Sequence, residues 1–148
     1  MSDDLTELYQ ELILDHSRSP RNFRVMPNCR HVAQGNNPIC GDNYTLYADL
    51  DGDVVRDISF QGSGCAISKA SASILTESLK GKTRAEVRAM FDKVRDMVTT
   101  GDADGLGKVA ALAGVHKFPA RVKCAILPWH ALVAAMEGQS AVSTEKEE

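Results

Sequence analysis

The chain has 148 residues, 43% of them hydrophobic, which fits one compact domain with a sizeable core. Its formal net charge of -3, and the lack of a basic stripe with interleaved aromatic residues, argue against nucleic-acid binding. The chain begins with Met1-Ser2-Asp3-Asp4, which is acidic where a secretory signal would be basic, and no apolar run approaches the roughly 20 residues that span a bilayer. We therefore expect a cytoplasmic protein without a membrane segment.

The four cysteines are Cys29, Cys40, Cys65 and Cys124. In a reducing cytoplasm they are poor candidates for disulfides, which leaves metal binding, catalysis or ordinary burial. No Cys-x-x-Cys pair is present, so a zinc ribbon and a thioredoxin-like redox motif are both excluded. Any site that several cysteines share must be assembled by the fold from distant segments.

The first half of the chain predicts one helix followed by an antiparallel sheet. Apolar residues at helical spacing indicate an amphipathic helix over Leu5–His16, which the polar cluster around Pro20 ends. Alternating polar and apolar residues then indicate strands. Three strands are expected, the last two of them joined by the turn Asp51-Gly52: His31–Gln34, Tyr44–Leu50 and Val54–Gln61.

The second half predicts helices. They are expected at Ala66–Leu79, at Thr83 to about Val98 with a capping box from Thr83 to Glu86, at most as a short helix over Lys108–Ala113, and at Pro119–Glu137. Pro128 removes a backbone donor from the last helix, which predicts a kink or local unwinding at Cys124. We expect an α+β fold in one domain over residues 1–138, with a flexible tail over 139–148.

Three of the cysteines and one carboxylate are candidates for a shared metal site. Cys65 follows Gly64 where a strand runs into a helix, and backbone N–H groups at a helix start favour a thiolate. Gly41 separates Cys40 from Asp42 and lets both side chains turn toward one centre. Together with Cys124 they would form a tetrahedral zinc site. The alternative is that each cysteine is a small buried hydrophobic residue.

Two cations flank Cys124 and would offset the negative charge of such a site. Arg121 lies one helical turn before Cys124 and Lys123 immediately precedes it, so either can approach the ligands; otherwise both are solvated surface groups. Cys29 has no partner motif, and we expect it not to be a ligand. The four histidines are expected to be structural.

With these motifs in their order and spacing, the chain resembles the U-type iron–sulfur cluster assembly proteins, and most closely their zinc-dependent SufU branch. The resemblance covers nearly the whole chain except its tail. It is carried by Asp15-His16, Pro20-Arg21-Asn22, Asn37-Pro38, Cys40-Gly41-Asp42, the stretch from Gly62 to Ser68, Ala70 to Ser73, Lys117 to Arg121, and Cys124-Ala125.

The resemblance implies a SufE/NifU-like α/β sandwich, with an antiparallel three-stranded sheet and helices packed on one side. It also implies that Cys40, Asp42, Cys65 and Cys124 form the metal site. In the scaffold branch a histidine typically precedes the third cysteine, where this chain has Lys123. The chain also carries an additional region over Gly101–Val115. Both departures favour zinc-dependent sulfur transfer over a simple scaffold role.

The resemblance implies that the protein accepts persulfide sulfur from a pyridoxal-phosphate cysteine desulfurase and passes it to downstream cluster assembly scaffold proteins. Cys40 is the expected acceptor because its proline- and glycine-flanked loop can move. The alternative function is a scaffold that builds and transfers a transient [2Fe–2S] cluster on the same residues. In a third interpretation, zinc only stabilises the fold.

Overall fold

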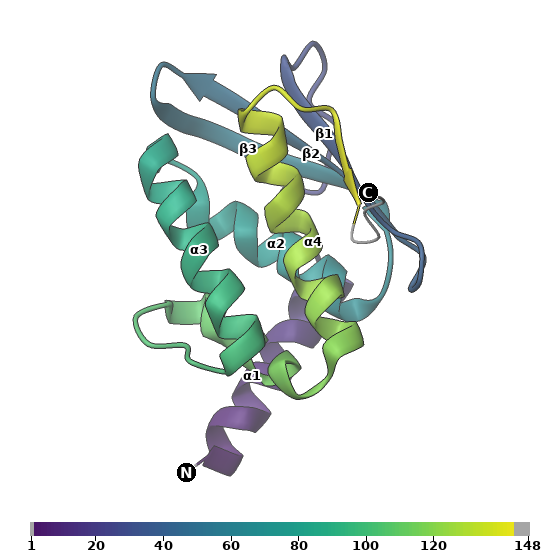
Figure 1. Cartoon of the computed structure of the whole chain (residues 1–148), viewed down its shortest axis with the longest axis vertical. Coiled ribbons are helices and arrows are strands. Elements are labelled where there is room, and N and C mark those ends of the chain that lie inside the picture. The colour runs from purple at the N-terminus through teal and green to yellow at the C-terminus, as the bar shows by residue number, and fades with distance from the viewer. Residues whose placement is uncertain (1, 144–148) are drawn as a thin grey trace.

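The computed structural model describes residues 2–143, with side chains from residue 9 onward. One sheet lies against a layer of helices (Figure 1). The elements in chain order are α1 (Ser2–Arg18), β1 (His31–Asn37), β2 (Asp42–Asp51), β3 (Val54–Ser63), α2 (Ala66–Leu79), α3 (Arg84–Thr100), the 3₁₀-helix η1 (Gly107–Lys117), α4 (Pro119–Met136) and β4 (Ala141–Ser143).

The sheet is built on the predicted antiparallel strands β1, β2 and β3. β2 pairs with both neighbours, and alternate residues along it are buried under the helices, from Asp42 and Tyr44 to Leu46 and Ala48. Because side chains alternate between the faces of a strand, this pattern places the helices on one side of the sheet. The α+β fold class, with its antiparallel sheet and one-sided helices, is therefore confirmed.

A fourth strand adds to the predicted sheet. β4 pairs in parallel with β1, and Gln34 donates its backbone N–H to the carbonyl of Ser140 at 2.9 Å. Residues 139–143 therefore do not form the flexible tail that their polar composition predicted. Strand pairing uses backbone groups, which composition does not reveal, and β1 would otherwise expose an unpaired edge. Residues 144–148 lie outside the described part of the chain.

The helix boundaries agree closely with the sequence pattern. α2 spans its predicted range, and Thr83 and Glu86 form the predicted capping box at the start of α3. α4 packs on β1 and β2 and is buried along most of its length. The helix continues through Pro128, so the predicted local unwinding does not occur, while a kink stays a prediction.

The helical segment before α4 is longer than predicted. The short helix expected at Lys108–Ala113 is an 11-residue 3₁₀-helix, η1, that packs against α3. Other helices surround η1 and bury its small and apolar residues. Its sequence therefore has no amphipathic period that would predict the helix. The buried residues are Val109, Ala110, Ala111, Leu112 and Val115.

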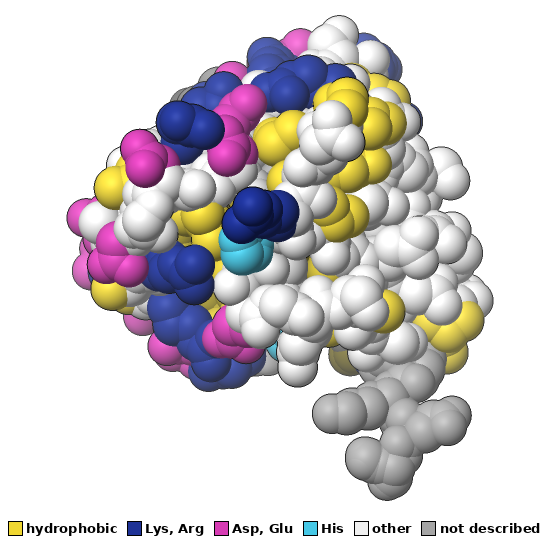
Figure 2. Space-filling view, turned by 90° about the horizontal axis from the view of Figure 1, so that it is seen from above, with side chains coloured by type: hydrophobic (Ala, Val, Ile, Leu, Met, Phe, Trp, Pro, Cys, Tyr) yellow, Lys and Arg dark blue, Asp and Glu magenta, His cyan; other side chains and the backbone are white. Residues whose placement is uncertain are grey.

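No helix in residues 2–143 is long and apolar enough to cross a membrane. Basic and acidic side chains are intermixed on the face seen in Figure 2, so that face has no field of a single sign.

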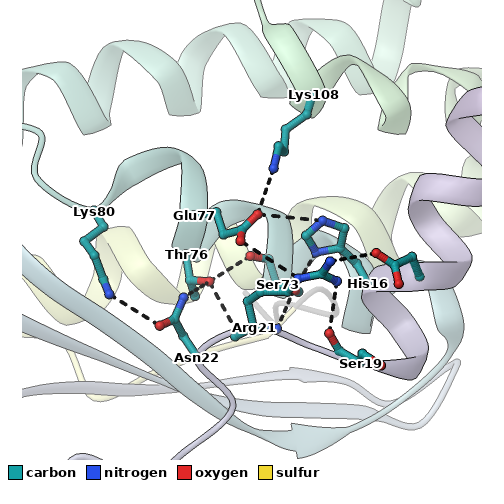
Figure 3. A network of polar contacts seen from close by, with 10 residues as sticks. His16, Ser19, Arg21, Asn22, Ser73, Thr76, Glu77, Lys80 and Lys108 are labelled. Carbon is teal, nitrogen blue, oxygen red and sulfur yellow. Dashed lines mark hydrogen bonds and ion pairs between the residues drawn. The ribbon is translucent and has the colours of Figure 1, made fainter.

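A polar network joins the end of α1 to α2 and η1 (Figure 3). The ring of His16 is 1% exposed, and its Nδ1 lies 2.6 Å from Oγ of Ser73, which also accepts the backbone N–H of Arg21 at 2.8 Å. Lys108 reaches from η1 to Glu77 at 2.8 Å. The motif residues His16 and Arg21 therefore fix the N-terminal helix against α2.

The same network lines one side of a shallow groove of about 650 Å³. The cations along the groove are all paired with carboxylates of the chain: Arg21 with Asp15 at 2.6 Å, Lys80 with Asp57 at 3.1 Å, and Lys108 with Glu77 at 2.8 Å. Since these charges neutralise one another internally, we assign the groove a structural role.

Burial, followed by the charge of Arg21, lowers the pKa of His16 below its ordinary value of 6.5. The unfolded chain then binds more protons than the folded chain between that lowered pKa and 6.5. We therefore expect the free energy of unfolding to fall as the pH drops through about 6.5, and this fall to be smaller in His16→Gln. Denaturant unfolding from pH 8 to 5 measures it, with His116→Gln, outside the network, as the control. An identical pH dependence in wild type and His16→Gln would contradict this role for His16.

Candidate metal centre

A tight turn between β1 and β2 carries two candidate ligands, Cys40 and Asp42. Asn37 ends β1 and Asp42 begins β2, and the backbone N–H of Gly41 donates to the carbonyl of Asn37 at 2.9 Å. Gly41 has φ +75, a conformation that glycine adopts without steric cost. The turn leaves Cys40 exposed at its tip and buries Asp42 completely.

The third candidate ligand, Cys65, is the N-cap residue of α2. Its sulfur accepts the backbone N–H of Ser68 at 3.4 Å, in the way a serine or aspartate oxygen caps a helix. The predicted helix-terminal thiol is thus present.

The fourth candidate, Cys124, brings the group together from α4. Ligand atoms of Cys40, Asp42 and Cys124 all lie within 4.8 Å of one another. Ligands of a tetrahedral ion with metal–sulfur bonds of about 2.3 Å are about 3.8 Å apart, so this spacing suits one shared ion. Cys65 lies outside that tight group, but the thiols of Cys65 and Cys40 are both near enough to Cys124 to raise the pKa of its thiol.

The carboxylate of Asp42 is fixed from several sides. Its Oδ1 accepts the backbone N–H of Cys65 at 2.9 Å and the hydroxyl of Ser68 at 3.2 Å. Its Oδ2 accepts the side-chain amide of Asn37 at 3.3 Å. Such donors compensate the carboxylate oxygens for the water that they lose on burial.

The surroundings of Cys124 oppose the loss of its thiol proton. Burial above all, and then its contacts with Asp42, Cys40 and Cys65, raise the pKa of the Cys124 thiol far above its ordinary range. A cation among these groups reverses that effect by holding the sulfur as a thiolate. Thiol and carboxylate donors gathered from separate elements therefore fit a divalent metal ion.

The other candidates lie apart from this cluster. Arg121 and Lys123 are exposed on the first turns of α4, and within residues 2–143 no hydrogen bond joins Arg121 to a candidate ligand, so their role beside the metal stays a prediction. Cys29 lies in the loop before β1, and its thiol contacts the backbone carbonyl of Ala48 at 3.3 Å. Trp129 is buried in the core.

Three residues around Asp42 had no role assigned from the sequence. They are Asn37, Tyr44 and Ser68, all completely buried, and the hydroxyls of Tyr44 and Ser68 are 2.9 Å apart. The sequence held a signal for Asn37, because its side-chain amide comes shortly before Cys40 and Asp42 and can donate hydrogen bonds to a negatively charged ligand. Tyr44 and Ser68 resembled ordinary strand and helix residues.

Fold and site together define a small α+β domain with a cysteine-rich centre suited to a metal ion. The family model described as the NifU-like N terminal domain matches residues 8–125, and the chain belongs to this family. It is 46% identical to the zinc-dependent sulfurtransferase SufU of Bacillus subtilis, over 91% of this chain and 95% of that protein.

Two further relatives agree with this family. The iron–sulfur cluster assembly scaffold protein IscU of Streptococcus pyogenes is 40% identical over 90% of this chain and 85% of that protein. A crystal structure described as a candidate iron–sulfur cluster assembly scaffold for the SUF system of Fervidobacterium islandicum is 38% identical. It superposes with a TM-score of 0.78, covering 82% of this chain and 91% of that chain.

Gly64 has no room for a side chain. A Cβ atom there would lie 2.5 Å from Oδ1 of Asp42 and 2.7 Å from both Ser68 Oγ and Tyr44 Oη. We expect Gly64→Ala to displace Asp42, to cost about 1–3 kcal/mol of stability and to weaken metal binding. The measurements are denaturant unfolding and competition with a metal chelator. Gly114→Ala, where a Cβ meets nothing within 4 Å, is the matched control. Equal metal affinities of the two variants would contradict the expectation.

Proposed function

We propose that this iron–sulfur cluster assembly protein is a zinc-dependent sulfur acceptor that takes persulfide sulfur from a cysteine desulfurase. Cys40, Asp42, Cys65 and Cys124 would bind the ion. The proposal is supported by the similarity to the SufU sulfurtransferase over almost the whole chain and by a donor set of thiols and one carboxylate. Downstream cluster assembly scaffold proteins would receive the sulfur.

One observation supports Cys40 as the acceptor. Of the four cysteines only Cys40 is exposed, whereas Cys124 is buried and Cys65 is half-buried. A sulfur atom that must meet a second protein has to be accessible, and a turn can move with less loss of packing than a helix. Cys40 therefore combines access to a partner with a place beside the metal.

The transfer step conserves atoms and electrons. The thiolate of Cys40 attacks the terminal sulfur of the desulfurase persulfide, so that a new sulfur–sulfur bond forms at Cys40. The sulfur–sulfur bond on the desulfurase breaks, and its cysteine leaves as a thiolate. Zinc, when bound, keeps the Cys40 thiol deprotonated before the partner docks. Cys40 then carries the persulfide to the next protein.

Apolar side chains near Cys40 offer the partner a contact. Ile39 is 69% exposed next to Cys40, and Phe118 is 59% exposed at the N-cap of α4, the helix that carries Cys124. Large exposed apolar side chains often mark protein contacts. Trp129 does not belong to this surface, because its ring is buried in the core and its indole N–H donates to Oγ of Ser71 at 3.0 Å.

The test of the acceptor is the turnover of a SufS-type cysteine desulfurase with Cys40→Ser. We expect wild type to stimulate sulfide production and Cys40→Ser to abolish the stimulation, because a hydroxyl is not a nucleophile toward a persulfide at neutral pH. Cys29→Ser is the matched control. Full stimulation by Cys40→Ser would assign the acceptor role elsewhere.

The contact surface is tested separately. Ile39→Asp should raise the concentration of this protein that half-saturates the desulfurase by about 10-fold, since loss of an apolar anchor and a misplaced charge cost at least about 1.4 kcal/mol. The maximal rate and the metal content should stay close to wild type. Val25→Asp, which changes an exposed valine on the loop between α1 and β1, is the control. Equal effects of both variants would exclude a specific contact at Ile39.

A second function has support from the same donors. Three thiolates and one oxygen ligand also suit a transient [2Fe–2S] cluster, and the Streptococcus pyogenes relative is named as a scaffold. Anaerobic reconstitution separates the two functions. Transfer of an intact cluster to an apo-ferredoxin without any zinc dependence would favour the scaffold over sulfur transfer.

A further inference from the structure

Two buried side chains each join Asp42 to one of the cysteines. The hydroxyl of Ser68 donates to Asp42 Oδ1 at 3.2 Å and lies 3.6 Å from the sulfur of Cys65. The side-chain amide of Asn37 lies 3.3 Å from Asp42 Oδ2 and 3.7 Å from the sulfur of Cys124. We call Asn37 and Ser68 the ligand clamp.

The clamp has its own support. Tyr44 lies behind Ser68, with 2.9 Å between the two hydroxyl oxygens, and both residues are completely buried. When Tyr44 donates to Ser68, the proton of Ser68 can point at Asp42 Oδ1, 3.2 Å away, or at the backbone carbonyl of Cys65, 3.1 Å away. Water does not reach these groups, so it cannot replace a donor that is lost.

The clamp also fixes the orientation of the Asp42 carboxylate. The backbone N–H of Cys65 and the hydroxyl of Ser68 lie at Oδ1, and the side-chain amide of Asn37 lies at Oδ2. The close approach of Gly64 to Oδ1 confines that side further. The carboxylate therefore has little freedom to turn.

Cys40 is held less firmly. Its side chain is exposed. The turn around it is open, since a Cβ on Gly41 would meet nothing within 4 Å.

We propose that Asn37 and Ser68 are positioning residues that hold Asp42, Cys65 and Cys124 as a preassembled set of three ligands. These three side chains would then be able to hold a metal ion whether or not Cys40 also binds it. The inference rests on the proposed metal ligands and adds what holds three of them in place. It does not depend on which partner supplies the sulfur.

The test measures metal binding without any desulfurase. Full-length Ser68→Ala and Asn37→Ala are titrated with Zn²⁺ against a chromophoric chelator. Co²⁺ in place of zinc reports tetrahedral geometry and thiolate ligands through its visible and near-ultraviolet absorption. We expect each variant to lose about 10–100-fold in affinity, as when a partner that orients a metal ligand is removed. The thiolate-to-cobalt bands should persist, because all three cysteines remain.

Ser71→Ala is the matched control for Ser68→Ala. Ser71 lies one turn further along α2, is completely buried, and donates its hydroxyl to the carbonyl of Ala125 at 2.6 Å. Its loss should lower stability without changing metal affinity. Asn36→Ala, at the exposed neighbour, is the control for Asn37→Ala. If the controls weaken metal binding as much as the clamp variants do, the clamp is refuted.

The decisive comparison is made in a Cys40→Ser background. The preassembled set predicts that Cys40→Ser still binds Co²⁺ in a tetrahedral site, and that adding Ser68→Ala or Asn37→Ala increases the rate of metal loss to a chelator at least about 10-fold. Equal rates in the single and double variants would overturn the proposal. If neither alanine variant folds, Tyr44→Phe removes only the hydroxyl behind Ser68: weaker metal binding supports the clamp and unchanged binding contradicts it.

These outcomes are independent of the acceptor test. Loss of the clamp effect with intact stimulation of the desulfurase would overturn the clamp alone. A confirmed clamp with no stimulation by wild type would instead overturn sulfur transfer.

Discussion

The burial of one carboxylate determines how the centre is built. Asp42 is completely buried, and an ionised carboxylate in such a place is tolerated only with donors around both oxygens. The start of α2 supplies two of these donors, the backbone N–H of Cys65 and the hydroxyl of Ser68, and the buried end of β1 supplies the amide of Asn37. The cysteines gather where the chain has already been arranged to hold a negative charge.

This dependence explains the sequence around the site. Gly41 allows the turn that lets Asn37 and Asp42 meet, and Gly64 lets the backbone pass close to the carboxylate. Cys65 serves twice, because its N–H holds Asp42 while its sulfur caps α2. Short-range backbone geometry therefore sets the distances between ligands that are far apart in the chain.

Much of the fold could be predicted from local patterns, because those patterns are themselves the cause of the structure. Thr83 and Glu86 satisfy the start of α3 by a capping box, and alternation along β2 reflects its two faces. The extension of β1 to Asn37, the fourth strand and the length of η1 could not be predicted in this way. They depend on backbone pairing and on burial by other elements, which leave no period in the sequence.

The candidate site, too, could be predicted only in part. Side chains whose chemistry is conspicuous, such as Cys40, Asp42 and Cys124, could be proposed as a group from residue type and family motifs. The roles of Ser68 and Tyr44 depend on which atoms meet across a helix and a strand. Serine and tyrosine are common in both kinds of element, so residue type alone does not distinguish a structural hydroxyl from one that orients a ligand.

The short strand β4 ties the end of the described chain to the metal centre. It pairs with Gln34, Gly35 and Asn36, and the next residue of β1 is Asn37. A chain ended after Gly138 would leave this stretch as an open sheet edge, free to shift or to pair with another molecule. Residues 141–143 thus brace from outside the strand end that carries the Asn37 amide.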